Sequence, residues 1–320
     1  MLLCMAFAQR PHGQGSAKLL VLNKEDATLA IVDPASGKVL GTVPTGPGPH
    51  ELVVSTDGRY AFASNYGTGP APGSTISMID IAAQKERRRI SVAPLQRPHG
   101  LAFQNGKLLF TAEASRKIAR YDPAADKIDW EFETGLNVTH MVLPTPDGKT
   151  LLTSNIGSNS VSIIEQGTSG SWTQTAVPVG RGPEGIDVSA DGKTAWSAHS
   201  QDGGVSIIDI PSKKVVATIA LGTKRSNRIK LTHDGRFALV SDLDAGDLVV
   251  VDTSARKEAK RIPLGKMPEG IVIPPGRDGD GTAYVAVNGD NFIAVVDLKT
   301  WAVTRKIQTG SGPDGMAWKP

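Results

Sequence analysis

The hydrophobic residues of this chain come in short runs that polar turn residues separate. The pattern is clearest at residues 183–222, which read PEGIDVSADGKTAWSAHSQDGGVSIIDIPSKKVVATIALG. This stretch holds four strand-sized runs, rich in β-branched residues and partly alternating between apolar and polar, with Asp-Gly, Asp-Gly-Gly and Pro-Ser turn signals between them. The pattern predicts an antiparallel meander of four strands, labelled A to D from the inside out.

The same unit recurs along the chain with a period of about 40–50 residues, which is typical of a radial or stacked array. Its A-to-B turn is Asp-Gly or Asn-Gly, beginning at Asp57, Asn105, Asp147, Asp191, Asp234 and Asp280. Seven A strands are predicted to begin at Pro49, Pro98, Thr139, Pro183, Ser226, Pro268 and Pro313. Seven C strands end in an acidic residue, at Asp33, Asp80, Asp122, Glu165, Asp209, Asp252 and Asp297.

The two ends of the chain carry complementary parts of one unit. The first unit, from about Lys18, has only strands B, C and D, whereas the C-terminal segment SGPDGMAWKP is a lone strand A. Pairing of that strand with the first three closes a ring and removes the open sheet edges. The sequence therefore predicts one all-β domain over residues 18–320, a seven-bladed β-propeller with four antiparallel strands in each blade.

The repeat also resembles a known family. Its features are Pro-x-Gly, an apolar pair, Asp-Gly-Lys, a strand ending in Asn and a strand ending in Val-Ile-Asp, as in PEGIDVSADGKTAWSAH, TPDGKTLLTSNIGSNSVSIIE and TAYVAVNGDNFIAVVD. They are similar to the YVTN-repeat β-propellers and cover nearly the whole chain after residue 17. This superfamily includes binding modules, haem-d1-type proteins and lactonase-like enzymes, so the resemblance implies the fold and leaves the function open.

The N-terminus suggests export. Residues 1–8, MLLCMAFA, look like the end of a secretory signal peptide cleaved after Ala8, although a disordered terminus is the alternative. Residues 9–17 are then a linker, and the mature protein is expected in the periplasm or secreted. Cys4 is the single cysteine, so the mature chain would have neither a disulfide nor a catalytic thiol. No segment approaches the ~20 apolar residues of a membrane span.

Charge and motifs exclude several classes of function. Lys and Arg number 35 against 32 Asp and Glu, and no basic face accompanies this small excess, so nucleic acid is not expected as a partner. The chain has no CxxCH for covalent haem, no GxSxG nucleophile elbow and no phosphate-binding glycine-rich loop before a helix. Serine hydrolase and nucleotide-dependent chemistries are therefore disfavoured.

In a propeller, the D-to-A and B-to-C connections lie on one face, around the mouth of the central channel. The residue after the start of each A strand should form a first ring there: His50, His99, His140, Glu184, Asn227, Glu269 and Asp314. The residue eight after the turn Asp or Asn should form a second ring, with Asn23 in the equivalent place of the first unit: Asn23, Asn65, Glu113, Asn155, His199, Asp242 and Asn288.

The first ring suggests a metal site. His50, His99 and His140 come from consecutive blades, and three converging imidazoles can hold Zn, Cu or Fe. Glu113 lies in the same sector as a fourth ligand or a base. A solvated polar mouth is the alternative, and an Asn at the end of strand B often binds its own backbone instead of a ligand.

Two departures from the repeat add candidate residues. Arg228 replaces the Gly that usually follows the ring residue, so it would either hold an anionic ligand or form a salt bridge to Glu184 or Glu269. The second departure is the lengthened loop YGTGPAPGST at residues 66–75, which is either a lid or a tolerated insertion.

Three functions remain open. The first is binding of a small molecule or metal at the mouth, with a protein partner on the propeller face as a further option. The second is a metal-dependent lactonase-like hydrolase or lyase, with Glu113, Glu184 or Glu269 transferring a proton and the ligand contacted by Arg228, Asn227, Asp314, His199 and Asp242. The third is a haem-d1-like cofactor on one histidine, which leaves two imidazoles without a role.

Overall fold

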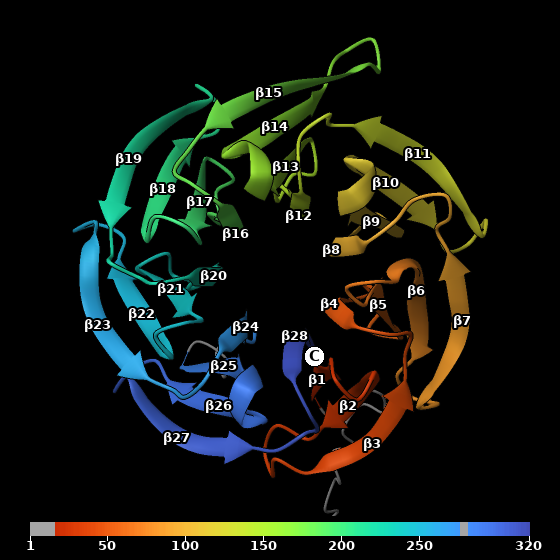
Figure 1. The fold of residues 1–320 in the computed structure, drawn as a ribbon, viewed down its shortest axis with the longest axis vertical. Coiled ribbons are helices and arrows are strands. Elements are labelled where there is room, and N and C mark those ends of the chain that lie inside the picture. The colour runs from red at the N-terminus through yellow and green to blue at the C-terminus, as the bar shows by residue number, and fades with distance from the viewer. Residues whose placement is uncertain (1–16, 276–280) are drawn as a thin grey trace, which may run out of the picture.

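The chain forms a ring of seven sheets around a central axis in a computed structural model that describes residues 17–275 and 281–320 (Figure 1). Each sheet is a blade of four antiparallel strands. The predicted all-β, seven-bladed propeller is therefore confirmed. The predicted signal segment 1–8 with Cys4, the linker up to residue 16 and the turn residue Asp280 lie outside the described residues.

In every blade the four strands follow one another from the channel outward. Blades 1 to 4 are β28 (Pro313–Lys319), β1 (Lys18–Asn23), β2 (Thr28–Val32), β3 (Val39–Pro44); β4 (Pro49–Val54), β5 (Tyr60–Gly67), β6 (Pro72–Asp80), β7 (Lys85–Ser91); β8 (Pro98–Gln104), β9 (Lys107–Ala112), β10 (Lys117–Asp122), β11 (Lys127–Glu133); and β12 (Thr139–Pro144), β13 (Thr150–Asn155), β14 (Ser160–Gln166), β15 (Trp172–Pro178). Blades 5 to 7 are β16 (Pro183–Val188), β17 (Thr194–His199), β18 (Gly204–Asp209), β19 (Lys214–Ala220); β20 (Ser226–Leu231), β21 (Phe237–Asp242), β22 (Asp247–Asp252), β23 (Lys257–Pro263); and β24 (Pro268–Val272), β25 (Thr282–Val287), β26 (Phe292–Asp297), β27 (Ala302–Ile307). Short 3₁₀ turns η1 (Glu113–Ser115), η2 (Ile156–Ser158) and η3 (Asn288–Asp290) follow three of the B strands.

The two ends of the chain close the ring as the sequence predicts. Strand β28 pairs with β1, so that Lys18 lies opposite Lys319 and Val21 opposite Met316. The seven inner strands begin at the seven predicted residues. This closure leaves every inner strand paired within its own blade.

A β-bulge at the start of each inner strand orients the first ring. In blade 5, Pro183 pairs with His199 and the next pair is Ile186 with Ser197. The inner strand therefore has one more residue between these two pairs than its partner strand has. The same shift occurs in the other six blades. Because the ring residue is the first residue inside this bulge, its side chain is aimed differently from a regular strand position.

Glycines after the ring residue bring the inner strands together. Blades 1, 3, 5 and 7 carry Gly315, Gly100, Gly185 and Gly270 at this position. A Cβ atom there would lie between 2.2 Å (Gly315) and 2.8 Å (Gly185) from a carbonyl oxygen of the next inner strand. Only glycine permits this approach, which also packs the ring side chains against one another. Blades 2, 4 and 6 carry Glu51, Met141 and Arg228 instead.

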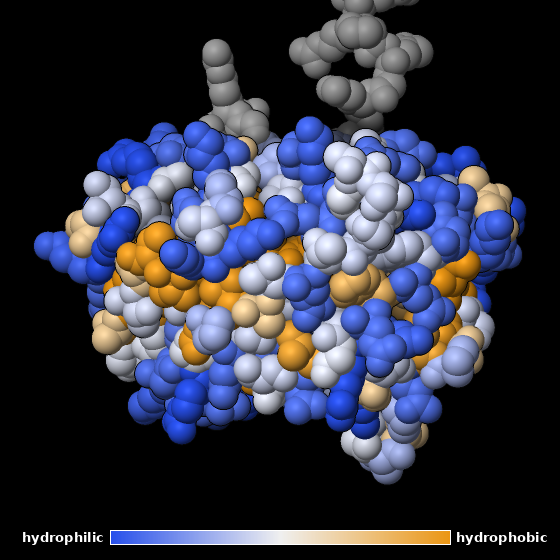
Figure 2. Space-filling model, turned by 90° about the horizontal axis from the view of Figure 1, so that it is seen from above, coloured by the Kyte–Doolittle hydropathy of each residue, from blue (hydrophilic) through white to orange (hydrophobic). Residues whose placement is uncertain are grey.

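The hydrophobic core lies between the blades. Each cluster of buried apolar residues combines neighbouring sheets; one of them contains Phe62 of blade 2 and Phe110 of blade 3, and the Phe62 ring stacks on Phe103 at 5.4 Å between centroids. Seen edge-on in Figure 2, apolar residues that reach the surface lie at mid-height, with polar residues on both faces. Among the described residues, no helix has the length and apolarity needed to cross a membrane.

Candidate functional site

The two kinds of loop that were expected at the mouth do meet on one face. The corner after strand B bonds the loop that enters strand A, through Tyr66 N to Gly48 O at 3.0 Å and Glu113 N to Arg97 O at 3.1 Å. The first ring lies beneath these loops, but it is packed and not an open, solvated mouth. Of its seven members, only His50 is partly exposed, and the other six are buried. The seven side chains form three groups.

The first group joins His99, His140 and Glu113. The Nδ1 atom of His140 contacts Oε1 of Glu113, and the rings of His99 and His140 lie 3.8 Å apart between centroids. One ligand atom from each of the three residues lies within 4.8 Å of the other two. Both nitrogens of His99 and Nε2 of His140 have no hydrogen-bond partner among the described residues. These free nitrogens and the carboxylate form a set of metal-ligand atoms.

The environment favours the ligating forms of this group. Burial and the nearby His140 and His50 lower the pKa of His99 well below its usual value, which keeps its imidazole neutral. Burial alone would raise the pKa of Glu113, but His140 and the hydrogen bond from Tyr66 bring it below the ordinary value. A neutral imidazole and an ionised carboxylate are the forms that bind metals.

Tyr66 is a member of this site that the sequence analysis missed. Its hydroxyl donates to Oε2 of Glu113 at 2.5 Å, and burial and that carboxylate raise its pKa, so it stays a phenol. The Arg97 guanidinium lies 4.8 Å from the centre of the Tyr66 ring and donates to Gly69 O at 2.9 Å. The hairpin that joins β5 to β6 thus holds Tyr66 against the histidines; within the predicted loop 66–75, only residues 68–71 lie between the two strands. Its position directly after the second-ring residue Asn65, in the lengthened loop, was the available signal.

The second group contains His50, Glu269 and Asp314. Asp314 Oδ2 lies 2.5 Å from His50 Nδ1 and 3.4 Å from Lys24 Nζ. Burial and the neighbouring Asp314 raise the pKa of Glu269 to about 10. Glu269 is therefore a neutral acid at neutral pH, and Lys24 already compensates Asp314. The three predicted histidine ligands thus fall in two groups of possible ligand atoms, although the rings of His50 and His99 still lie 4.4 Å apart between centroids.

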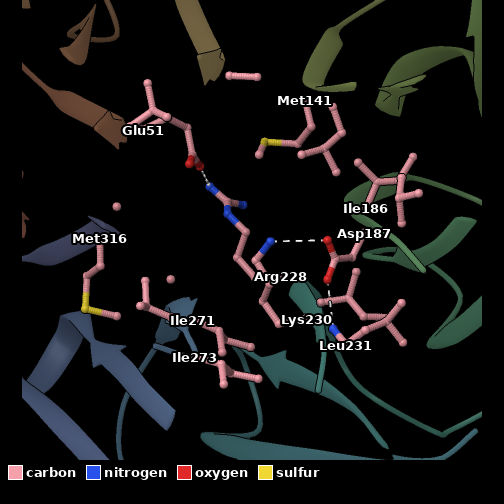
Figure 3. Close-up of a pocket in the computed structure, with 18 of the residues that line it drawn as sticks. Glu51, Met141, Ile186, Asp187, Arg228, Lys230, Leu231, Ile271, Ile273 and Met316 are labelled. Carbon is pink, nitrogen blue, oxygen red and sulfur yellow. Dashed lines mark hydrogen bonds and ion pairs between the residues drawn. The ribbon is translucent and has the colours of Figure 1, made fainter. Parts of the chain in front are cut away.

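The third group links Glu184, Asn227, Arg228 and Glu51. Asn227 Nδ2 donates to Glu184 Oε1 at 2.7 Å, and Arg228 Nη1 donates to Asn227 Oδ1 at 3.1 Å. Arg228 reaches across the channel and donates through Nη2 to Oε1 of Glu51 (Figure 3). The sequence predicted a salt bridge from Arg228 to Glu184 or Glu269. Glu184 Oε1 does lie 3.9 Å from Nη1 of Arg228, but the main partner of the guanidinium is Glu51. Arg228 is buried within the channel, so it does not stand free at the mouth.

Most of the second ring supports loops. Asp242 accepts the backbone N–H groups of Lys224 and Arg225, both at 2.9 Å, and Asn65 accepts that of Gly46 at 3.0 Å. His199 contacts Asp202 through Nδ1 at 3.0 Å. These side chains hold connections in place, and the backbone group that Asn65 binds belongs to the loop entering its A strand and not to its own turn. Within this ring, Glu113 is the member whose side chain contacts a first-ring residue, His140.

Comparisons with known proteins agree with this architecture. The family model described as lactonase, 7-bladed beta-propeller matches residues 23–274. No curated relative matches the sequence significantly.

Three solved structures illustrate the similarity. Kuenenia stuttgartiensis hydrazine synthase is 21% identical, with a TM-score of 0.72 over 84% of this chain and 89% of that chain. The Pseudomonas aeruginosa periplasmic gluconolactonase PpgL is 18% identical, with a TM-score of 0.75 over 95% and 99%. The dihydro-heme d1 dehydrogenase NirN, in complex with DHE, is 15% identical, with a TM-score of 0.67 over 97% and 77%. At these identities the likeness shows the fold alone, and the three names describe different chemistries.

Proposed function

Because the chain belongs to the seven-bladed β-propeller lactonase family, we propose that its function resides in the first ring, which binds a divalent transition-metal ion through His99, His140 and Glu113. The observation that supports this proposal is that the imidazole of His99 is buried without hydrogen-bond partners in the part of the chain that the structure describes. Its side chain is 1% exposed, yet neither ring nitrogen has a hydrogen-bond partner among the described residues. A buried polar atom without a partner costs about 1–3 kcal/mol, which a bond to a metal would offset.

The ligand set fits Zn, Cu or Fe. Two imidazoles and one carboxylate are a common way to hold these ions with positions left open. The second group fits a metal less well, since Lys24 and the proton on Glu269 already balance its charge.

Metal analysis tests the proposal. Untagged protein is supplemented with Zn, Cu and Fe, desalted and measured for bound metal. We expect a stoichiometric metal in the wild type and its loss in His99→Ala. The matched control is His199→Asn, because other blades carry Asn at this position; it should retain the metal. Metal-free wild type, or full metal content in His99→Ala, would contradict the proposal.

Hydrolysis of a small lactone is the second candidate, and family membership supports it. A metal ion at the first group would polarise the lactone carbonyl or acidify a bound water. In this candidate His99 and His140 would hold the metal, and Glu113, oriented by Tyr66 and His140, would accept a proton in place of acting as a ligand, while the neutral acid Glu269 would donate one. Glu184 accepts a hydrogen bond from Asn227, so we propose that it positions Asn227 and does not transfer a proton.

A panel of lactones and small esters separates the two candidates. Metal-dependent turnover that disappears in His99→Ala would establish the hydrolase, whereas a flat panel with metal bound would leave a binding protein. A haem-d1-like cofactor would use one axial imidazole and leave the others unexplained, so we rank it below both.

We also propose that the protein acts in the periplasm or outside the cell, on the basis of residues 1–8. Fractionation of cells expressing the full chain, with and without these residues, tests this location.

A further inference from the structure

The central channel contains a cavity that the first ring does not use. It measures about 550 Å³ and begins at Arg228 and Glu51 (Figure 3). From there it follows the inner strands to residues at their far ends, such as Ala190 and His233. Because the first ring lies at the opposite ends of the same strands, this channel cavity opens on the other face of the propeller. The Arg228–Glu51 pair separates the two.

Apolar side chains form most of the wall of the channel cavity. All seven inner strands contribute, and the apolar residues include Val53, Phe103, Leu143, Val188, Leu231 and Trp318. Its volume lies within the ~300–1,000 Å³ of small-molecule sites, which are mainly apolar with a few polar groups that fix orientation. The cavity is therefore suited to a small ligand with an apolar body.

Two ion pairs provide the charge in the wall. Lys230 Nζ lies 3.2 Å from Oδ1 of Asp187, whose Oδ2 accepts the N–H of Leu231 at 2.8 Å, so this pair is satisfied. At the inner end, Glu51 uses Oε1 for Arg228. The bond through Oε1 is the one side-chain hydrogen bond that Glu51 makes to the described residues, and its side chain, 14% exposed, lines the cavity.

The charge at the inner end is unbalanced. The guanidinium of Arg228 forms ion pairs with two carboxylates, those of Glu51 and Glu184, so one positive charge faces two negative charges. A second cation beside Glu51 would compensate this excess, whereas an added carboxylate would meet the repulsion of both groups.

We propose that the channel cavity binds a small apolar amine, whose ammonium group donates to Oε2 of Glu51 while its apolar body lies against Phe103, Leu143 and Trp318. Arg228 keeps its bond to Oε1, so one carboxylate bridges two cations. This site is distinct from the proposed metal site and does not depend on it.

Calorimetric titration with three probes of matched shape tests the proposal at neutral pH: phenylbutylamine, phenylbutanol and phenylbutyrate. A charge-assisted hydrogen bond predicts that the amine binds about tenfold or more tightly than the alcohol. Glu51→Gln should remove that advantage and leave the affinity for the alcohol unchanged. Val188→Trp, which fills the cavity, should abolish binding of both probes. The exposed control Glu25→Gln should bind like the wild type.

Three results would overturn the proposal. They are equal affinity for the amine and the alcohol, tighter binding of the carboxylate, or amine binding that persists in folded Val188→Trp. Circular dichroism checks that each variant is folded. If Glu51→Gln does not fold, the relative affinities of the three probes for the wild type and for Val188→Trp still test whether the channel cavity binds the amine.

Discussion

Replacing Glu269 with glutamine should change how the stability of the fold depends on pH. Burial and Asp314 raise the pKa of Glu269 to about 10 from an ordinary value of 4.5. The folded protein therefore holds a proton there that the unfolded chain releases above pH 4.5. A raised carboxyl pKa stabilises the fold below the unfolded value, and this stability is lost as pH rises toward the folded value.

The magnitude follows from the width of this window. Each pH unit removes about 1.4 kcal/mol of unfolding free energy, so the wild type loses roughly 3 kcal/mol between pH 4.5 and pH 7 through this group alone. Glutamine is neutral at every pH and its amide can donate to Asp314. The variant should therefore not show this loss, and its stability relative to the wild type should rise with pH.

Urea unfolding followed by tryptophan fluorescence, at several values between about pH 5 and pH 8, measures the effect through the slope of free energy against pH. The difference between Glu269→Gln and wild type should grow steadily across this range. Glu25→Gln, at an exposed site, should show a constant difference. A constant difference for Glu269→Gln as well would mean that Glu269 is ionised in the folded protein, and the description of the second group would be wrong.

Three further predictions concern other groups. Arg228→Met leaves Glu51 and Glu184 without their cation, so thermal unfolding should show a loss of about 3–5 kcal/mol, and adding Glu51→Met should recover part of it. Tyr66→Phe removes the donor to Glu113, so zinc titration should show about tenfold to hundredfold weaker binding with unchanged thermal stability. Asp242→Ala frees the N–H groups of Lys224 and Arg225, so denaturant unfolding should show a loss of about 2 kcal/mol while bound metal is unchanged; loss of metal would restore Asp242 as a ligand-binding residue.

The fold could be predicted in full because its signals are local. Turn residues, apolar runs and the starts of inner strands at residues such as Pro49 and Pro183 recur within each unit and need no information from other blades. The split strand at Pro313–Lys319 could also be recognised, since a lone strand A at one end matched the missing strand at the other.

The candidate site was predicted less completely, because spacing gives the position of a residue but not the direction of its side chain. His99, His140 and Glu113 were correctly expected in one sector. The pairing of Arg228 with Glu51 joins residues 177 positions apart, and no local pattern indicates which blades face each other across the channel. His199 and Asp242 occupy the predicted ring, yet their side chains turn to a neighbouring loop.

The closure of blade 1 has a consequence for biosynthesis. Blades 2 to 7 are each contiguous in the sequence, so each can pair its four strands as it leaves the ribosome. Strands β1 to β3 emerge first, but the inner edge of β1 has no partner until residues 313–319 have been made. During almost all of translation the nascent chain therefore carries an open strand edge, which is a site for aggregation.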